Sequence, residues 1–168
     1  MTRVLVFDTT ALSYFALTGK LDLLKQMVES FACVAPVEVL NELTAGVATH
    51  PELQDTLNLP WIQTVQLSDG DLATFARYKR ELGGGPSKNV GEAAVLAWCA
   101  RTGETAIIDE SRARNIAHQD GIDVHGSLWL IQRGVRSELL DHSAAAALID
   151  ELRSAGMYLP EDSEMLIA

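Results

Sequence analysis

Short apolar runs recur along the chain and are separated by longer segments of mixed polarity. Residues 3–7, 31–35 and 105–108 are almost continuously apolar, which is typical of strands buried on both faces of a parallel sheet. Residues 61–67 alternate between apolar and polar positions, so we expect an outer strand there. A shorter run at 122–124 completes the set of predicted strands.

The segments between these runs have the spacing of amphipathic helices. Pro36 suits the first turn of one helix, Ser68 and Asp71 form a capping-box-like start of another, and Asn89 is placed to cap a third. The predicted helices span residues 9–15, 21–28, 36–46, 51–57, 68–82, 90–101, 111–119, 127–133 and 144–153. Strands that alternate with helices predict an α/β fold with a mostly parallel, helix-covered sheet.

The composition fits one globular domain over residues 1–168, since 48% of the residues are hydrophobic and 21% are charged. No apolar run approaches the roughly 20 residues of a membrane span, and the N-terminus lacks the features of a signal peptide, so we expect a cytoplasmic protein. Cys33 and Cys99 have neither a CxxC nor a Cys/His spacing, so we expect two reduced core residues rather than a zinc site.

Two predicted strands end in an acid. Asp8 directly follows the first apolar run, and Asp109 follows the run at 105–108. Ligands of open α/β sheets bind beyond the carboxyl ends of the strands, so both carboxylates are expected at the edge that carries the site. The alternative is that each aspartate only caps the helix that follows it.

Two further acids are placed to join them. Glu92 follows Gly91 in the first turn of an apolar helix, where it could face the cleft or only favour the helix dipole. Glu38 and Glu42 lie one turn apart, and of the two we favour Glu42 as the inward-facing acid.

Four carboxylates in one cleft repel each other and need compensating charge. Oxygen ligands of this kind suit Mg²⁺ or Mn²⁺, and a pair of such ions about 3.5–4 Å apart can activate water and stabilise the leaving oxygen of a phosphodiester. The residues therefore predict a metal-dependent nuclease.

In order and spacing, these motifs resemble the PIN domain superfamily, in a VapC-like prokaryotic branch long described only as a domain of unknown function. The resemblance runs almost the whole length of the chain. It is carried by Asp8 with Thr10 and Leu12, by Glu42, by Gly91-Glu92, by Asp109-Glu110 with Ala113-Arg114 and Ala117, by Gly121, by Gly126-Ser127, and by residues 152–160.

The resemblance implies a three-layer α/β/α sandwich and Mg²⁺- or Mn²⁺-dependent endonucleolytic cleavage of single-stranded RNA. The family is often the toxin of a toxin–antitoxin pair and often dimeric, which implies an antitoxin partner and a homodimer. The family's catalytic acids fall on Asp8, Glu42, Glu92 and Asp109, with Asp8, Glu92 and Asp109 as metal ligands.

Two positions beside these acids remain to be interpreted. Thr10 matches a hydroxyl that would orient a carboxylate or a metal-bound water. The branch commonly has two adjacent aspartates where this chain has Asp109-Glu110, which leaves open how Glu110 takes part.

Phosphate contacts would need cations near the same edge. Arg112 and Arg114 follow Asp109, and Lys88 precedes Glu92, so these three are the candidates, although each can also be an ordinary solvated charge. The glycines before Lys88 do not form a P-loop, because no glycine directly precedes the lysine and no serine or threonine follows it.

The net charge of −10 is unusual for a protein that binds nucleic acid. It favours the main alternative, a non-catalytic PIN-like module that binds RNA or a partner without cutting. A phosphatase of the haloacid-dehalogenase type also begins with a strand ending in aspartate, but Thr10 stands where its general acid is expected.

Overall fold

The computed structural model describes residues 1–167, apart from the side chain of Glu164. A parallel sheet of five strands forms its centre, in the order β3-β2-β1-β4-β5. The strands are β1 (Val4–Phe7), β2 (Ala32–Pro36), β3 (Ile62–Val65), β4 (Thr105–Ile107) and β5 (Val124–His125). The helices are α1 (Thr9–Leu17), α2 (Leu21–Met27), α3 (Val37–Gly46), α4 (Leu72–Leu82), α5 (Val90–Thr102), α6 (Ser111–Gln119), α7 (Ser127–Arg136), α8 (His142–Ser154) and α9 (Ser163–Leu166), with short 3-10 helices at Pro51–Thr56 and Asp69–Asp71.

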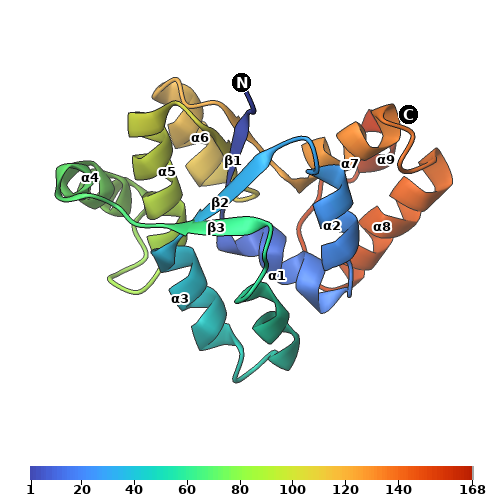
Figure 1. Cartoon of the computed structure of the whole chain (residues 1–168), viewed down its shortest axis with the longest axis horizontal. Coiled ribbons are helices and arrows are strands. Elements are labelled where there is room, and N and C mark those ends of the chain that lie inside the picture. The colour runs from blue at the N-terminus through green and yellow to red at the C-terminus, as the bar shows by residue number, and fades with distance from the viewer. Residues whose placement is uncertain (168) are drawn as a thin grey trace.

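Helices cover both faces of the sheet. Figure 1 shows α4, α5 and α6 on one side of the strands and α2, α7, α8 and α9 on the other. This arrangement confirms the predicted three-layer α/β/α sandwich, and β3 is the outer strand that its alternating polarity predicted.

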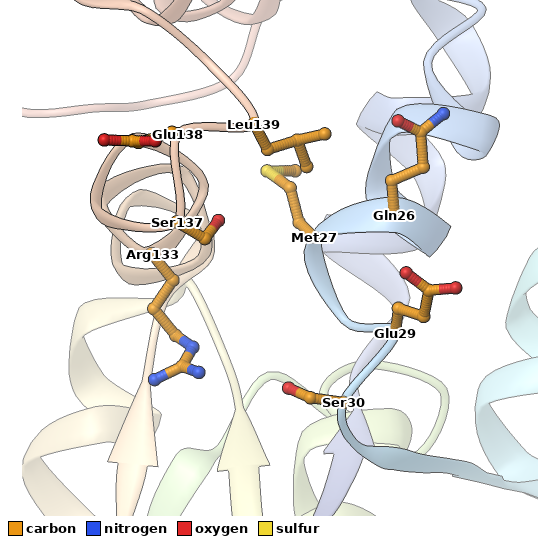
Figure 2. Close-up of a pocket in the computed structure, with 8 residues that line it drawn as sticks. All are labelled: Gln26, Met27, Glu29, Ser30, Arg133, Ser137, Glu138 and Leu139. Carbon is orange, nitrogen blue, oxygen red and sulfur yellow. The ribbon is translucent and has the colours of Figure 1, made fainter.

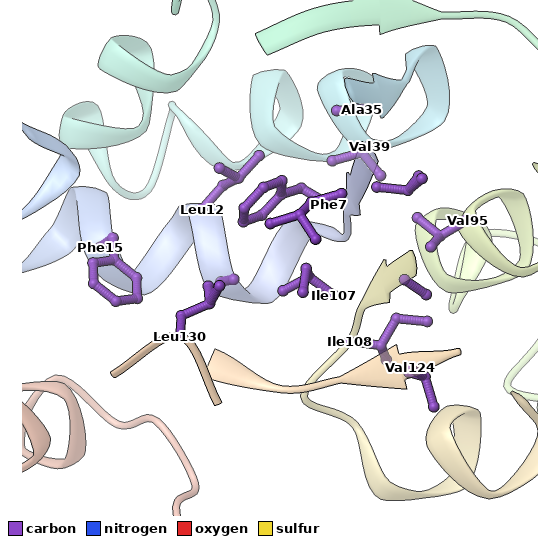
Figure 3. Close-up of a cluster of buried hydrophobic side chains, with 14 of the residues drawn as sticks. Phe7, Leu12, Phe15, Ala35, Val39, Val95, Ile107, Ile108, Val124 and Leu130 are labelled. Atoms are coloured by element: carbon purple, nitrogen blue, oxygen red, sulfur yellow. The ribbon is translucent and has the colours of Figure 1, made fainter. Parts of the chain in front are cut away.

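The core lies between the sheet and these helices. Leu5, Val6 and Phe7 of the central strand are fully buried, as their continuous apolar run predicted. Figure 3 shows Phe7 grouped with Leu12 of α1 and Ile107 of β4. Burial of such side chains stabilises the fold by about 1.5–3 kcal/mol for each large residue, so the core fixes the position of the strand ends.

The order of the strands fixes where a site can form. β1 pairs with β2 on one side and with β4 on the other. The chain first adds β2 and β3 on one side of β1 and then adds β4 and β5 on the other side, so the strand order reverses between β1 and β4. In open α/β sheets the crevice at such a switch point is where ligands bind. Asp8 comes directly after β1, and Asp109 comes two positions after the last residue of β4. The two predicted acids therefore flank this switch point.

The observed elements extend or shorten some predicted ones. α7 continues through Gly134 to Arg136, and α8 already begins at His142.

Within residues 1–167, no helix is long and apolar enough to cross a membrane.

Candidate metal centre

Asp8 lies at the start of α1, directly after the central strand. Its backbone N–H donates to the carbonyl of Ile107 at 3.1 Å, which ties it to β4. Asp8 occupies the N-cap position of α1, but its side chain makes no capping hydrogen bond to that helix. Both carboxylate oxygens are buried and have no hydrogen-bond partner among the described residues. A buried, unpartnered carboxylate is costly unless something binds it.

Glu42 and Glu92 bring their carboxylates to Asp8. One oxygen from each of the three side chains lies within 4.8 Å of the other two. Asp8 follows β1, Glu42 comes from α3 and Glu92 from the first turn of α5, so the three acids come from elements that are far apart in the sequence. We call Asp8, Glu42 and Glu92 the carboxylate cluster.

Gly91 makes room for the cluster. A Cβ atom at this position would lie 2.0 Å from Oε1 of Glu42 and 3.0 Å from Oδ1 of Asp8. Any larger residue would therefore displace the carboxylates, which gives a physical reason for glycine immediately before Glu92.

The surroundings of Asp8 and Glu92 disfavour negative charge on these two acids. Burial raises the pKa of Asp8 well above its usual range, and the nearby carboxylates of Glu92, Glu42 and Asp109 raise it further. Burial and the Glu42 carboxylate also raise the pKa of Glu92. The cleft thus holds more negative charge than it can stabilise alone.

Thr9 holds Glu42 in place. Its hydroxyl donates a hydrogen bond of 2.7 Å to Oε1 of Glu42. Thr10, which sequence comparison favoured as the orienting hydroxyl, makes no side-chain hydrogen bond within the part of the chain that the structure describes. The two threonines are adjacent in the sequence, and only the tertiary structure shows that it is Thr9 that contacts Glu42 of α3.

Asp109 borders the cluster but does not belong to it. Its Oδ1 accepts a hydrogen bond of 2.7 Å from the backbone N–H of Ser127, and its Oδ2 accepts one of 2.7 Å from the Ser127 hydroxyl. Ser127 is the first residue of α7, so the carboxylate lies at the positive end of that helix. Burial raises the pKa of Asp109, while the Ser127 hydrogen bonds and the Arg114 guanidinium oppose the rise.

Gly126 permits this arrangement in the same way as Gly91. A Cβ there would lie 2.8 Å from both Oδ1 of Asp109 and a terminal nitrogen of Arg114. Of the three cations predicted to contact phosphate, Arg114 is half-buried and lies near Asp109, whereas Arg112 and Lys88 are exposed.

Glu110 has a structural role that its position after Asp109 did not reveal. Its carboxylate accepts hydrogen bonds from the backbone N–H groups of Arg112 at 2.9 Å and Ala113 at 2.7 Å. It is therefore the N-cap of α6. The residue that caps α6 is therefore Glu110, and not Asp109 as the alternative interpretation of that aspartate had it.

Asn89 occupies the N-cap position of α5, as predicted, but its side chain makes no capping hydrogen bond to the helix. Its side-chain amide instead donates to the carbonyl of Gly83 at 3.1 Å, and its own backbone has a positive φ of 57°. Lys79 of α4 donates to the carbonyl of Gly85 at 2.9 Å and also to that of Lys88. These bonds tie the glycine-rich loop to the end of α4.

The donor set fits a hard divalent cation. Mg²⁺ and Mn²⁺ prefer carboxylate oxygens, and a cation would neutralise the repulsion that raises the pKa of Asp8. The unpartnered oxygens of Asp8 are the observation that supports this fit.

A separate cavity of about 460 Å³ lies between α2 and α7. Figure 2 shows Arg133 and Leu139 on one side of it and Met27 and Glu29 on the other. None of the predicted site residues lines it, so it is not part of the metal centre.

Comparisons with known proteins bear on the fold and on the family of this chain. A chain in the crystal structure of VapBC2 from Rickettsia felis, bound to a DNA fragment from their promoter, superposes with a TM-score of 0.55 at 14% identity, covering 73% of this chain and 98% of that chain. At such low identity the likeness concerns the fold. A search of curated proteins gives no match. The sequence profile of DUF3368, described as a PIN domain, matches residues 4–165. Since this match spans almost all of the sequence, the chain belongs to the PIN domain family.

Proposed function

We propose that this protein is a Mg²⁺- or Mn²⁺-dependent endoribonuclease that cleaves single-stranded RNA. The single observation that carries the proposal is the buried, unpartnered carboxylate of Asp8 within 4.8 Å of Glu42 and Glu92. Structural carboxylates are normally hydrogen-bonded or paired with a cation, and this one is surrounded by further acids. Membership of the PIN domain family supports a nuclease and removes the basis for the phosphatase interpretation.

In this proposal Asp8 and Glu92 hold the cation, with Asp109 as a third ligand and Glu42 beside them. A bound divalent cation supplies the positive charge that polarises a phosphodiester and stabilises its leaving oxygen. Thr9 keeps Glu42 oriented, and a carboxylate of the cluster can accept the proton of the attacking water. Arg114, whose charge acts on Asp109, would contact a phosphate oxygen.

The protein partners are part of the proposal. The VapC-like sequence features, together with the fold shared with the VapBC2 complex, support an antitoxin that pairs with this chain as its toxin. A homodimer is expected for the same reason.

The test is cleavage of a single-stranded RNA by the purified chain with Mn²⁺ or Mg²⁺. We expect Asp8→Asn to abolish cleavage, because the amide cannot replace the charge that holds the cation. As a second readout, added Mn²⁺ should raise the melting temperature of the parent but not of Asp8→Asn, since a ligand that binds only the folded state stabilises it.

Asp150→Asn is the matched control, because Asp150 is exposed on α8 and its substitution leaves the cluster intact. It should behave as the parent in both assays. Cleavage that survives chelation, or that Asp8→Asn retains, would contradict the proposal.

The second candidate is a PIN-like module that binds RNA without cutting it, favoured by the net charge of −10. It predicts RNA binding with no metal-dependent cleavage. The same assay separates the two.

A further inference from the structure

A second cavity adjoins the metal centre. It has a volume of about 330 Å³, and its lining residues come from three parts of the chain: Thr10 and Tyr14 of α1, Asp109, Glu110 and Ser111 at the start of α6, and Gly156, Met157 and Tyr158 after α8. Asp109 lines this cavity and its charge also acts on Asp8, so the cavity lies beside the metal centre.

The segment after α8 is held against α1. The hydroxyl of Tyr14 donates to the carbonyl of Gly156 at 3.1 Å, and the backbone N–H of Met157 donates to the carbonyl of Leu152 at 3.0 Å. Met157 is 3% exposed and anchors the segment in the core. The wall of the cavity is therefore fixed although it comes from the end of the chain.

Tyr158 stands out on this wall. It is 77% exposed, and within residues 1–167 its side chain has no hydrogen bond or ring contact. Tyrosine is enriched at binding interfaces, because its ring is apolar and its hydroxyl is polar.

The chemistry of the lining selects the kind of ligand. The carboxylates of Asp109 and Glu110 border the cavity and would repel a phosphate, while the hydroxyls of Thr10 and Ser111 make no side-chain hydrogen bonds among the described residues. An uncharged aromatic group with polar edges fits these surroundings. The volume lies at the small end of ligand pockets, which range over about 300–1,000 Å³.

We propose that Tyr158, together with Tyr14, forms a stacking subsite for one base of a single-stranded RNA bound across the carboxylate cluster. The inference rests on the proposed function, and it explains how this acidic protein would bind its RNA substrate. Single-stranded nucleic acids commonly bind through bases stacked on aromatic side chains. Tyr158 is a binding residue in this role, since the reaction takes place at the cluster.

The test measures binding of a fluorescent single-stranded oligoribonucleotide to the full chain, with Asp8→Asn present throughout to prevent cleavage. Stacking is worth about 1–3 kcal/mol per base, so Tyr158→Ala should weaken binding by about fivefold or more. Tyr158→Phe keeps the ring and should bind within about twofold of its parent.

Abasic oligonucleotides sharpen the test. One abasic position should weaken binding to the parent and have little further effect on Tyr158→Ala, because the ring and the base contribute one shared contact. Met165→Ala is the matched control, since Met165 is also 77% exposed near the C-terminus but does not line the cavity. It should leave binding unchanged.

Equal binding by Tyr158→Ala and its parent, additive effects of the variant and every abasic position, or no RNA binding at all would overturn the inference. The proposed function is judged separately, by metal-dependent cleavage with Asp8 intact. Cleavage without an effect of Tyr158→Ala would refute the subsite alone, whereas stacking without cleavage would refute the nuclease alone.

Discussion

Gly91 is the residue on which the closeness of the three carboxylates depends. A Cβ at this position would come within 2.0 Å of Glu42 Oε1, far inside any normal contact. Glu42 is also held by Thr9, so its side chain cannot move away without losing that hydrogen bond. The geometry of the cluster is therefore sensitive to a single methyl group.

Gly91→Ala should reduce metal-dependent cleavage by at least about tenfold, since losing the support of a metal ligand typically costs 10–100-fold in affinity or activity. Alanine also favours helices more than glycine does, so the helix itself should tolerate the change. Titration of Mn²⁺ against the melting temperature would measure the loss of metal affinity without relying on activity.

Gly70→Ala is the control for this substitution. A Cβ at Gly70 would lie 3.6 Å from the Ser68 hydroxyl oxygen, an ordinary contact. It should leave cleavage unchanged. A Gly91→Ala protein with the metal affinity of the parent would show that the cluster adapts and that the glycine is not required.

At the scale of elements, the start of α4 is fixed by Asp71. Its carboxylate accepts hydrogen bonds from the backbone N–H of Ser68 at 2.8 Å and from Arg101 of α5 at 2.7 Å. Asp71 thus completes the capping box that Ser68 predicted and joins α4 to the end of α5. The contact between Asp71 and Arg101 depends on tertiary packing, so no local sequence pattern indicates it.

The stability contributed by Asp71 should depend on pH. Its hydrogen bonds to Arg101 and Ser68 lower the pKa of Asp71 below its usual value of 3.8. A lowered pKa means that the stabilisation is present above pH 3.8 and is lost as the pH falls through the folded-state pKa. Asp71→Asn should therefore lower the melting temperature at pH 7, and the difference from the parent should shrink toward pH 3.

Asp69→Asn provides the comparison, because Asp69 is exposed in the same short helix and makes no side-chain hydrogen bond among the described residues. Its melting temperature should match that of the parent at neutral pH. A difference between Asp71→Asn and the parent that stays constant down to pH 3 would contradict the assigned role.

At the scale of the whole molecule, the charge of −10 determines how the protein can bind RNA. Affinity that comes from phosphate contacts falls with added salt, with a slope of about −0.7 per neutralised phosphate for single strands. Lys88, Arg112 and Arg114 are the candidate contacts, and of these only Arg114 is half-buried beside the site. Base stacking on Tyr158 would supply affinity that does not depend on salt.

A plot of the logarithm of RNA affinity against the logarithm of KCl concentration should have a slope no steeper than about −2, from three contacts at most. The Asp8→Asn protein is suitable for this measurement because it does not cut the RNA. Arg114→Gln should make the slope shallower by about 0.7. A slope steeper than about −4 would require a basic surface that the proposed binding mode does not use.

The sequence by itself determined the fold class, and it singled out Asp8, Glu42 and Glu92, whose carboxylates lie together in the structure. The apolar runs at 3–7 and 105–108 predicted buried parallel strands, because a strand covered on both faces must be apolar throughout. Since parallel strands end at one edge, the same pattern placed Asp8 and Asp109 near each other.

Only the tertiary structure decided what each acid does. Glu42 reaches Asp8 from α3 and Thr9 binds it, whereas Asp109 is held by Ser127. The Thr9–Glu42 hydrogen bond joins residues 33 positions apart and the Asp109–Ser127 hydrogen bonds join residues 18 positions apart, so their geometry is set by how the elements pack. A periodic pattern records which face of an element is buried, and it carries no information about the partner that a polar side chain meets there.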